Sequence, residues 1–151
     1  MPTITPFMWF DTQAEEAMNF YASIFEDSRV ISVHRAQGQV MSVEFELQGQ
    51  RFMALNAGPH HTFNEAVSFF VACDSQEEID DLWAKLTAEG GAPNHCGWLK
   101  DKYGLSWQII PKELGRLLGD PDPAKSKRAM DAMMQMQKLD VSRLQRAYEG
   151  V

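Results

Sequence analysis

The chain has 151 residues, of which 44% are hydrophobic and 11% aromatic, and this composition is typical of one globular domain with a single core. It carries 14 Lys and Arg residues against 21 Asp and Glu, and the resulting net charge of −7 argues against a nucleic acid partner. No apolar run is long enough to span a membrane, no signal peptide pattern is present, and two cysteines provide neither a disulfide framework nor a Cys-x-x-Cys site. We therefore expect a cytoplasmic protein with reduced thiols.

One strand-to-helix pattern occurs twice in the chain. Apolar strand residues 7–10 run into Asp11-Thr12-Gln13, and residues 69–73 run into Asp74-Ser75-Gln76. After each junction, apolar residues recur at the spacing of one helix face. They are Ala17, Phe20, Tyr21 and Ile24 in the first copy, and Ile79, Leu82, Trp83 and Leu86 in the second.

Each predicted helix opens with a Ser/Thr-x-x-Glu sequence, Thr12 with Glu15 and Ser75 with Glu78. In such a capping box, the hydroxyl and the carboxylate pair with amides that the first helical turn leaves without partners. We therefore interpret these glutamates as capping groups and not as catalytic acids.

Further strand patterns complete both copies. Turns are predicted at Gly38 and Gly49 in the first copy, and Gly90-Gly91 ends the second helix. The sequence thus predicts two βαβββ modules, at about 1–58 and 66–112, within a domain at 1–115. The predicted strands that follow the helices are 29–34, 40–47 and 51–55 in the first module, and about 93–99 and 105–110 in the second.

Two segments lie outside the modules. Residues 59–64 join them and have no clear periodicity, so we predict a mobile loop or lid there. Residues 116–151 form a predicted C-terminal helical extension, in which Asp120-Pro-Asp-Pro123 interrupts regular structure and Ala124 to Tyr148 forms a helix or helix pair. The extension is rich in methionine and offers a surface for its own sheet or for a partner chain, and we favour the partner chain. The residues of that surface are Met130, Met133, Met134, Met136 and Leu139.

The paired modules come with a distinctive motif. From Cys96 to Pro111 it reads Cys-Gly-Trp-Leu-Lys-Asp-Lys-Tyr-Gly-Leu-Ser-Trp-Gln-Ile-Ile-Pro, and Lys138-Leu139-Asp140 follows in the tail. Together these features resemble the PhnB-like branch of the glyoxalase, bleomycin-resistance and dihydroxybiphenyl dioxygenase superfamily, over roughly the whole chain. The resemblance implies an α+β fold in which the two βαβββ modules form a curved mixed sheet that encloses a cup. Some members are named methyltransferases, but the sequence has no Gly-x-Gly-x-Gly loop after a strand to hold a methyl donor, which disfavours that activity.

The resemblance also implies where a divalent metal would bind, at His or Glu side chains on the first and last strand of each module. In this sequence the first-strand positions fall on Ser68 and on Thr5 or the residue before it. The last-strand positions fall on Gln108 and on either Met53 or Ala54. These side chains are poor ligands, so we expect no metal and no cofactor.

Side chains that alternate along the strands are candidates for the lining of the cup. The resemblance places Gln108 in the cup and Trp107 under a helix. The alternative for the aromatic candidates is that Phe7, Trp9 and Phe70 fill the core, and the alternative for Gln108 is that it satisfies only neighbouring backbone groups. The full set of ligand-binding candidates is Thr5, Phe7, Trp9, Ser68, Phe70, Trp98 and Gln108.

Three other residues invite a chemical role. His60 and His61 would supply a general base if their loop closed over the cup, and the alternative is an ordinary solvated loop. Cys96 follows His95, but adjacent strand residues point apart, so we favour a passive thiol. No hydrolase, zinc protease or P-loop motif occurs in the sequence.

Three functions remain open. The first is a homodimer that binds a small, partly aromatic or apolar molecule in the cup without the metal of the superfamily. The second is a metal-independent lyase or isomerase that uses Gln108, a lid histidine or Cys96. The third is an interaction module that uses the Met-rich tail. Catalysis would require an accessible group with a perturbed pKa, and binding would not.

Overall fold

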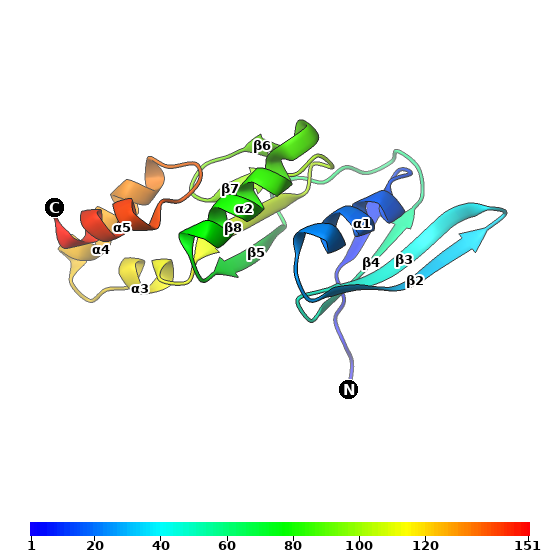
Figure 1. The fold of residues 1–151 in the computed structure, drawn as a ribbon, viewed down its shortest axis with the longest axis horizontal. Coiled ribbons are helices and arrows are strands. Elements are labelled where there is room, and N and C mark those ends of the chain that lie inside the picture. Colours follow the sequence, from blue (N-terminus) through cyan, green and yellow to red (C-terminus); the bar gives the residue numbers. More distant parts are fainter. The chain divides into compact units, whose positions relative to one another are not determined.

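A computed structural model describes residues 1–151, which divide into two compact units, Met1–Thr62 and Phe63–Val151. Each unit contains a βαβββ module with its own four-stranded mixed sheet, so the predicted duplication and the α+β fold are confirmed. Within each unit, one helix lies along one face of the sheet (Figure 1). The boundary between a domain at 1–115 and an extension at 116–151 stays a prediction. No helix combines the length and the hydropathy that crossing a membrane would require.

Unit 1 is built on a sheet with the strand order β1-β4-β3-β2. β1 pairs in parallel with β4, and the other neighbours are antiparallel. The predicted turns at Gly38 and Gly49 both have positive φ, which glycine adopts without a steric cost. The elements are β1 (Phe7–Phe10), α1 (Ala14–Ile24), β2 (Ser28–Ala36), β3 (Gln39–Leu47) and β4 (Gln50–Asn56).

The core of unit 1 lies between α1 and one face of this sheet. Met8 and Phe10 are buried, whereas Phe7 on the alternate face is exposed. Tyr21 of α1 stacks on Phe45 of β3, with ring centroids 6.5 Å apart. The strand alternation therefore directs one set of side chains to the helix and leaves the other set on a face without a helix.

The start of α1 differs from the predicted capping box. Thr12 and Glu15 do not form it, because the cap position is Gln13, whose side chain does not bond to the helix. Instead, Oδ1 of Asn56, at the end of β4, accepts a hydrogen bond from the Ala14 backbone N–H at 2.8 Å. Glu15 forms an ion pair with Arg35 at 2.7 Å. A residue distant in sequence thus supplies the cap.

The predicted cap of α2 is confirmed on its hydroxyl side. Oγ of Ser75 accepts from the Glu78 backbone N–H at 3.2 Å. The Glu78 carboxylate accepts from the Asp74 N–H at 3.3 Å, one residue before the amide that the motif usually pairs.

Unit 2 repeats the module and continues into three more helices. Its sheet has the order β5-β8-β7-β6, with β5 parallel to β8 and the remaining pairs antiparallel. The elements of the module are β5 (Ser68–Cys73), α2 (Gln76–Thr87), the 3₁₀ turn η1 (Ala88–Gly90), β6 (Ala92–Pro93), β7 (Trp98–Lys100) and β8 (Ser106–Pro111). The further helices are α3 (Leu114–Leu118), α4 (Pro123–Met134) and α5 (Val141–Glu149).

The core of unit 2 lies between α2 and its sheet. The predicted helix face is buried, and Leu99, Trp107 and Ile109 of the sheet are buried with it. Phe69 meets Trp107 edge to face, with ring centroids 5.3 Å apart. These contacts identify which face of each strand is turned toward the helix.

The turn between β7 and β8 is organised by a buried carboxylate. Oδ1 of Asp101 accepts from the backbone N–H groups of Tyr103 and Leu105, at 2.9 and 3.1 Å. Its Oδ2 accepts from Nε1 of Trp107 at 2.9 Å. Because Trp107 is held on the helix side, its neighbour Gln108 is turned to the opposite face.

The tail is helical as predicted and forms a helix pair, α4 and α5. Pro123 does not lie outside regular structure: it is the first residue of α4, where its missing N–H costs nothing, and Asp122 caps the helix. The tail packs on the end of β8 and on α3 in one buried cluster of unit 2. That cluster contains Ile110, Leu114, Leu117, Ala129, Met136, Leu139 and Leu144.

This packing corrects the expected role of the Met-rich surface. Met136 and Leu139 are buried in their own unit and Met133 packs against them, so these side chains are not available to a partner chain. Met130 and Met134 remain exposed, at 41% and 57%.

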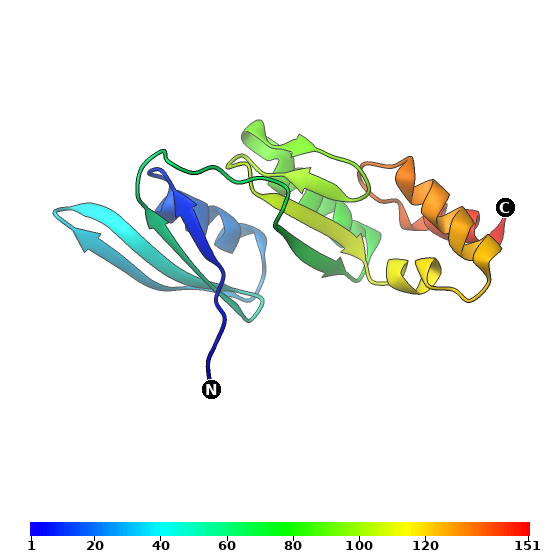
Figure 2. The same ribbon diagram turned by 180° about the vertical axis from the view of Figure 1, so that it is seen from behind.

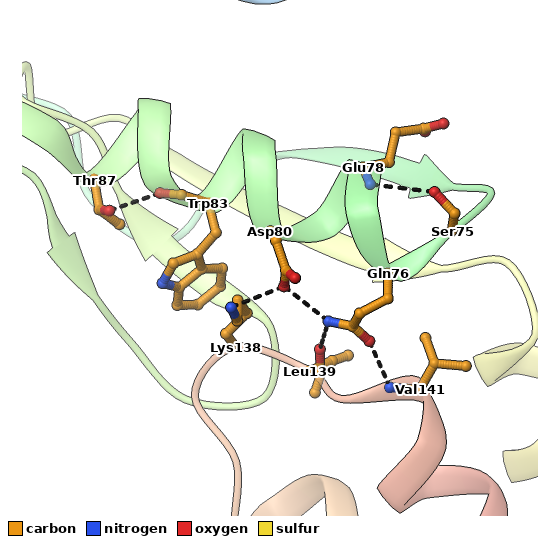
Figure 3. Close-up of polar contacts among 9 residues, drawn as sticks. All are labelled: Ser75, Gln76, Glu78, Asp80, Trp83, Thr87, Lys138, Leu139 and Val141. Atoms are coloured by element: carbon orange, nitrogen blue, oxygen red, sulfur yellow. Dashed lines mark hydrogen bonds and ion pairs between the residues drawn. The ribbon is translucent and has the colours of Figure 1, made fainter.

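Polar contacts attach the segment between α4 and α5 to the module (Figure 3). Nε2 of Gln76 donates to the Leu139 carbonyl at 3.0 Å, and its Oε1 accepts from the Val141 N–H at 2.8 Å. Lys138 forms an ion pair with Asp80 at 2.8 Å. One glutamine of α2 thus fixes the backbone on both sides of Asp140.

The same segment also pairs with the turn that precedes β7. Cys96 N–H donates to the Met136 carbonyl at 2.9 Å, and Gly97 N–H donates to the Gln137 carbonyl at 2.8 Å. A Cβ atom on Gly97 would lie 2.8 Å from Cδ1 of Ile110, so this close approach requires glycine. The tail therefore supports the entry into β7.

Candidate functional site

The sheet of unit 2 has one face that α2 does not cover. In Figure 2, α2 lies behind this sheet and the uncovered face is toward the viewer. The strand register places its side chains in two adjacent rows. We call the surface formed by these two rows of side chains the open face of unit 2. One row contains Ser68, Ser106 and Lys100, and the next contains Phe70, Gln108 and Trp98. Four of the predicted ligand candidates, Ser68, Phe70, Trp98 and Gln108, are thus brought together on one surface.

A polar pair lies at the centre of this face. Nε2 of Gln108 donates to Oγ of Ser68 at 2.9 Å. Gln108 is thus held by a neighbouring side chain, and its role in ligand binding stays a prediction. The bond leaves the Oε1 acceptor of Gln108 and the hydroxyl hydrogen of Ser68 for another molecule.

Phe7 and Phe70 do not fill the core of their units. Phe70 is 61% exposed and Phe7 is 55% exposed, whereas their neighbours Met8 and Phe10 are buried. Trp9 is partly buried, and its Nε1 donates to the Gly58 carbonyl at 2.9 Å.

Unit 1 has a comparable face without a helix. Phe7 is aligned with Met53 and Trp9 with Leu55 across the parallel pair of β1 and β4. Thr5 lies just before β1 and is partly buried. This face is therefore apolar around its two aromatic rings, and it carries three of the predicted ligand candidates, Thr5, Phe7 and Trp9.

His60 and His61 lie against Trp9. The His61 ring meets the indole edge to face with centroids 4.7 Å apart, and the His60 ring lies at 6.5 Å. Both histidines are exposed. The segment is therefore in contact with the aromatic face of unit 1, and its role as a lid stays a prediction.

The strand register distinguishes Met53 from Ala54 as the residue of the first module that corresponds to Gln108. Phe7 and Phe70 hold equivalent places in the two modules, and they pair with Met53 and Gln108 respectively. Met53 is thus the counterpart of Gln108, while Ala54 is buried on the helix side. The positions where the sequence resemblance places metal ligands, taken as Thr5, Met53, Ser68 and Gln108, hold two hydroxyls, a thioether and an amide, with no imidazole, carboxylate or thiolate.

This donor set does not fit a divalent metal ion, because it offers no negative charge to offset ion desolvation. Elsewhere, no group of three or more His, Cys, Asp and Glu side chains is placed to hold a metal ion.

The titratable groups with shifted pKa values are poor candidates for a base or a nucleophile. Lys100 forms an ion pair with Glu65 and lowers the pKa of that carboxyl, which makes it a weaker base. Burial, together with the nearby Glu78 and Asp74 carboxylates, raises the pKa of the Cys73 thiol to about 11. Neither group is prepared for proton transfer near neutral pH.

Cys96 does not lie in a strand, contrary to the sequence prediction. It occupies a turn with φ of 59°, and its Sγ lies 3.7 Å from Sδ of Met134. The argument from opposite strand faces therefore does not apply to His95, and the neighbour of the thiol is a thioether from the tail.

Sequence reasoning missed three groups near the open face of unit 2, namely Glu65, Lys100 and Ser106. Lys100 follows Trp98 by two positions. That spacing in a strand predicts that both side chains lie on the same face of the sheet. The contact of Glu65 with Lys100 had no local signal, because it joins two separate segments.

Comparison with known proteins gives the family. A family model described as 3-demethylubiquinone-9 3-methyltransferase matches residues 2–110. No curated protein matches the chain. A PhnB protein from Bacillus cereus, which carries the same methyltransferase name, is 38% identical over 73% of this chain and 99% of that chain, with a TM-score of 0.68.

Two more distant structures also match. A protein from Pseudomonas aeruginosa is 18% identical over 74% of this chain and 98% of that chain, with a TM-score of 0.63, and shows a shared fold alone. A glyoxylase/bleomycin resistance protein/dioxygenase domain from Frankia sp. is 15% identical over 74% of this chain and 92% of that chain, with a TM-score of 0.48.

The family model ends at residue 110, so its match includes none of the C-terminal extension at 116–151. The methyltransferase description is the name of a family and assigns no activity to this chain. The match of the family model spans the elements of both βαβββ modules up to residue 110. The chain therefore belongs to the family described as 3-demethylubiquinone-9 3-methyltransferase and is a PhnB-like protein, as the sequence motif predicted.

Proposed function

We propose that this protein binds a small, partly aromatic or apolar molecule on the open faces of its sheets, without a divalent metal ion. The observation that carries the proposal is the exposed ring of Phe70 in the same row as Gln108, whose amide is held by Ser68. Small-molecule sites typically combine such apolar surface with a few fixed polar groups. Trp98, on the other side of Gln108, widens the apolar surface.

The shifted pKa values of Glu65 and Cys73 identify no general base in unit 2. The carboxyl of Glu65 has a lowered pKa and the thiol of Cys73 a raised one, so neither is poised to exchange a proton at neutral pH. A metal-independent lyase or isomerase is the alternative. It would need a group on the open face of unit 2 whose pKa is shifted toward neutral pH.

The strand-to-helix junctions disfavour a methyltransferase. Both junctions consist of Asp followed by Thr or Ser, at Asp11-Thr12 and Asp74-Ser75, and neither contains a glycine. A nucleotide-like methyl donor is usually held where glycine lets the backbone approach it closely.

The proposal includes a homodimer. Phe7 and Phe70 expose large apolar rings on sheet faces that their own helices leave open, and such surface is favourable to bury against another module. Met130 and Met134 are the remaining exposed part of the Met-rich surface. Sedimentation of Phe7→Ser and of a Met130→Gln, Met134→Gln double variant separates the two surfaces, and a monomeric wild-type protein would contradict this part of the proposal.

A thermal-shift screen against a pool of small metabolites tests binding, because a ligand that binds only the folded state raises its stability. We expect a ligand that raises the melting temperature of the wild-type protein and loses its effect with Phe70→Ser or Gln108→Leu. Met41→Ser is the matched control. Met41 is also an exposed apolar residue, but it lies near the start of β3 in unit 1, on the sheet face that is turned toward the helix. An equal shift in all variants would place the ligand elsewhere and contradict the proposal.

A further inference from the structure

The open face of unit 2 carries one cation, Lys100, in the row next to the aromatic one. Lys100 is two residues from Trp98 on β7, and Leu99 between them is buried on the helix side. Side chains two residues apart on a strand are about 6–7 Å apart along it. A ring that stacks on Trp98 would therefore hold a substituent within reach of the ammonium group.

A carboxylate already lies on this cation. Glu65, in the turn before β5, forms an ion pair with Lys100, and both side chains are substantially exposed. An exposed ion pair of this kind contributes little to stability, about 0–1 kcal/mol, so another carboxylate can replace Glu65 at a small cost. The pair shows that the Lys100 ammonium group is placed to bind a carboxylate.

A buried hydroxyl in the same row points to the same chemistry. Oγ of Ser106 is buried and has no hydrogen-bond partner. In the strand register Ser106 lies between Ser68 and Lys100. A buried donor without an acceptor costs free energy, and a carboxylate oxygen that enters this row would supply the acceptor.

We propose that the open face of unit 2 binds an aromatic carboxylate, whose ring packs on Trp98 and Phe70 and whose carboxylate replaces that of Glu65 on Lys100. This inference rests on the proposed binding function and specifies its ligand class. Glu65 then acts as an internal competitor, so the two partners of the ion pair have opposite effects on affinity. The net charge of −7 repels anions, so the ring contacts must contribute most of the binding free energy.

Phenylacetate and phenylacetamide are suitable probes, because they share a ring and differ in charge. Titrations followed by the NMR signal of the Trp98 indole N–H report binding at this face. We expect the acid to bind about threefold more tightly than the amide, as a single exposed charge contact allows. Glu65→Gln should strengthen acid binding by a similar factor without changing amide binding, and Lys100→Gln should abolish the difference between the probes.

Asp81 and Lys85 provide the matched control, because they form a similarly exposed ion pair at 2.9 Å on α2, the helix that covers the opposite face. Asp81→Asn and Lys85→Gln change the same charges and should leave both affinities unchanged. Equal binding of acid and amide, or an affinity that Glu65→Gln does not raise, would overturn the inference but not the proposed function. Failure of both probes to perturb the Trp98 signal would overturn the inference, while the metabolite screen would still decide the proposed function.

Discussion

Asn56 caps helix α1 from the end of the strand β4. Its Oδ1 accepts from the Ala14 N–H at 2.8 Å, and its Nδ2 donates to the Val40 carbonyl at 3.2 Å. One side chain therefore joins the helix to two strands of the sheet in unit 1.

Asn56→Ala should lower the free energy of unfolding by about 1–2 kcal/mol, because it removes a helix cap and a bond to β3. Thr12→Ala is the matched control and should change stability by less than about 0.5 kcal/mol, since Thr12 does not cap the helix. Urea unfolding measures both. A larger loss for Thr12→Ala than for Asn56→Ala would contradict the observed cap.

Gly97→Ala should detach the tail from the turn before β7. Gly97 has φ of 85°, and a Cβ atom there would meet Ile110 at 2.8 Å and both the Ile109 carbonyl and Leu139 at 3.1 Å. We expect a loss of about 3 kcal/mol, from backbone strain and the steric conflict together.

Gly104→Ala separates the two contributions. Gly104 has the same φ of 85° but nothing within 4 Å of its Cβ position, so only backbone strain of about 1 kcal/mol is expected. Equal losses in the two variants, measured by thermal unfolding, would show that the tail does not pack closely on Gly97.

Cys73 should make the protein less stable at alkaline pH. Burial raises its pKa from 9.0 to about 11 in the folded state, so the unfolded chain ionises first. Stability is therefore fully present below about pH 9 and falls as the pH rises toward 11. Cys73→Ala should flatten this part of the stability curve relative to Cys96→Ala, and identical curves for the two variants would exclude the buried thiol as the cause.

Purified, untagged protein should contain far less than one divalent ion per chain. Thr5, Met53, Ser68 and Gln108 supply no charged ligand, and a bound ion would remain largely uncompensated. Elemental analysis measures the metal content, and a chelator should leave the melting temperature unchanged. Stoichiometric metal that is lost together with stability on chelation would contradict both the ligand assignment and the proposed metal-free binding.

The strands and helices were predictable where periodicity is local. Ile79, Leu82, Trp83 and Leu86 are buried as their spacing indicates, because a helix face needs only its own residues to be identified. The two βαβββ modules follow from that periodicity and from glycine turns. The helical tail was predictable from composition, but its packing was not, because it depends on contacts with Gln76 and Gly97.

The candidate site was predictable only in part. Alternation along β5 and β8 places Ser68, Phe70 and Gln108 on one face, and the structure agrees. The cap by Asn56 and the ion pair of Glu65 with Lys100 each join segments distant in sequence, and a single sequence holds no periodic signal for such contacts. The exposure of Phe7 and Phe70 was also not evident, since aromatic strand residues are more often buried.

The attachment of the tail makes the two copies of the repeated module unequal. Only unit 2 gains a second buried cluster, and the bonds from Cys96 and Gly97 to the tail tie the start of β7 to it. Amide hydrogens of β7 and β8 should therefore exchange with deuterium more slowly than those of the corresponding strands in unit 1. The chain thus contains two similar modules, and the one that the tail packs on should be the slower to open locally. That module also carries Phe70, Trp98 and Lys100. Unit 1, which lacks the tail, should therefore open locally first.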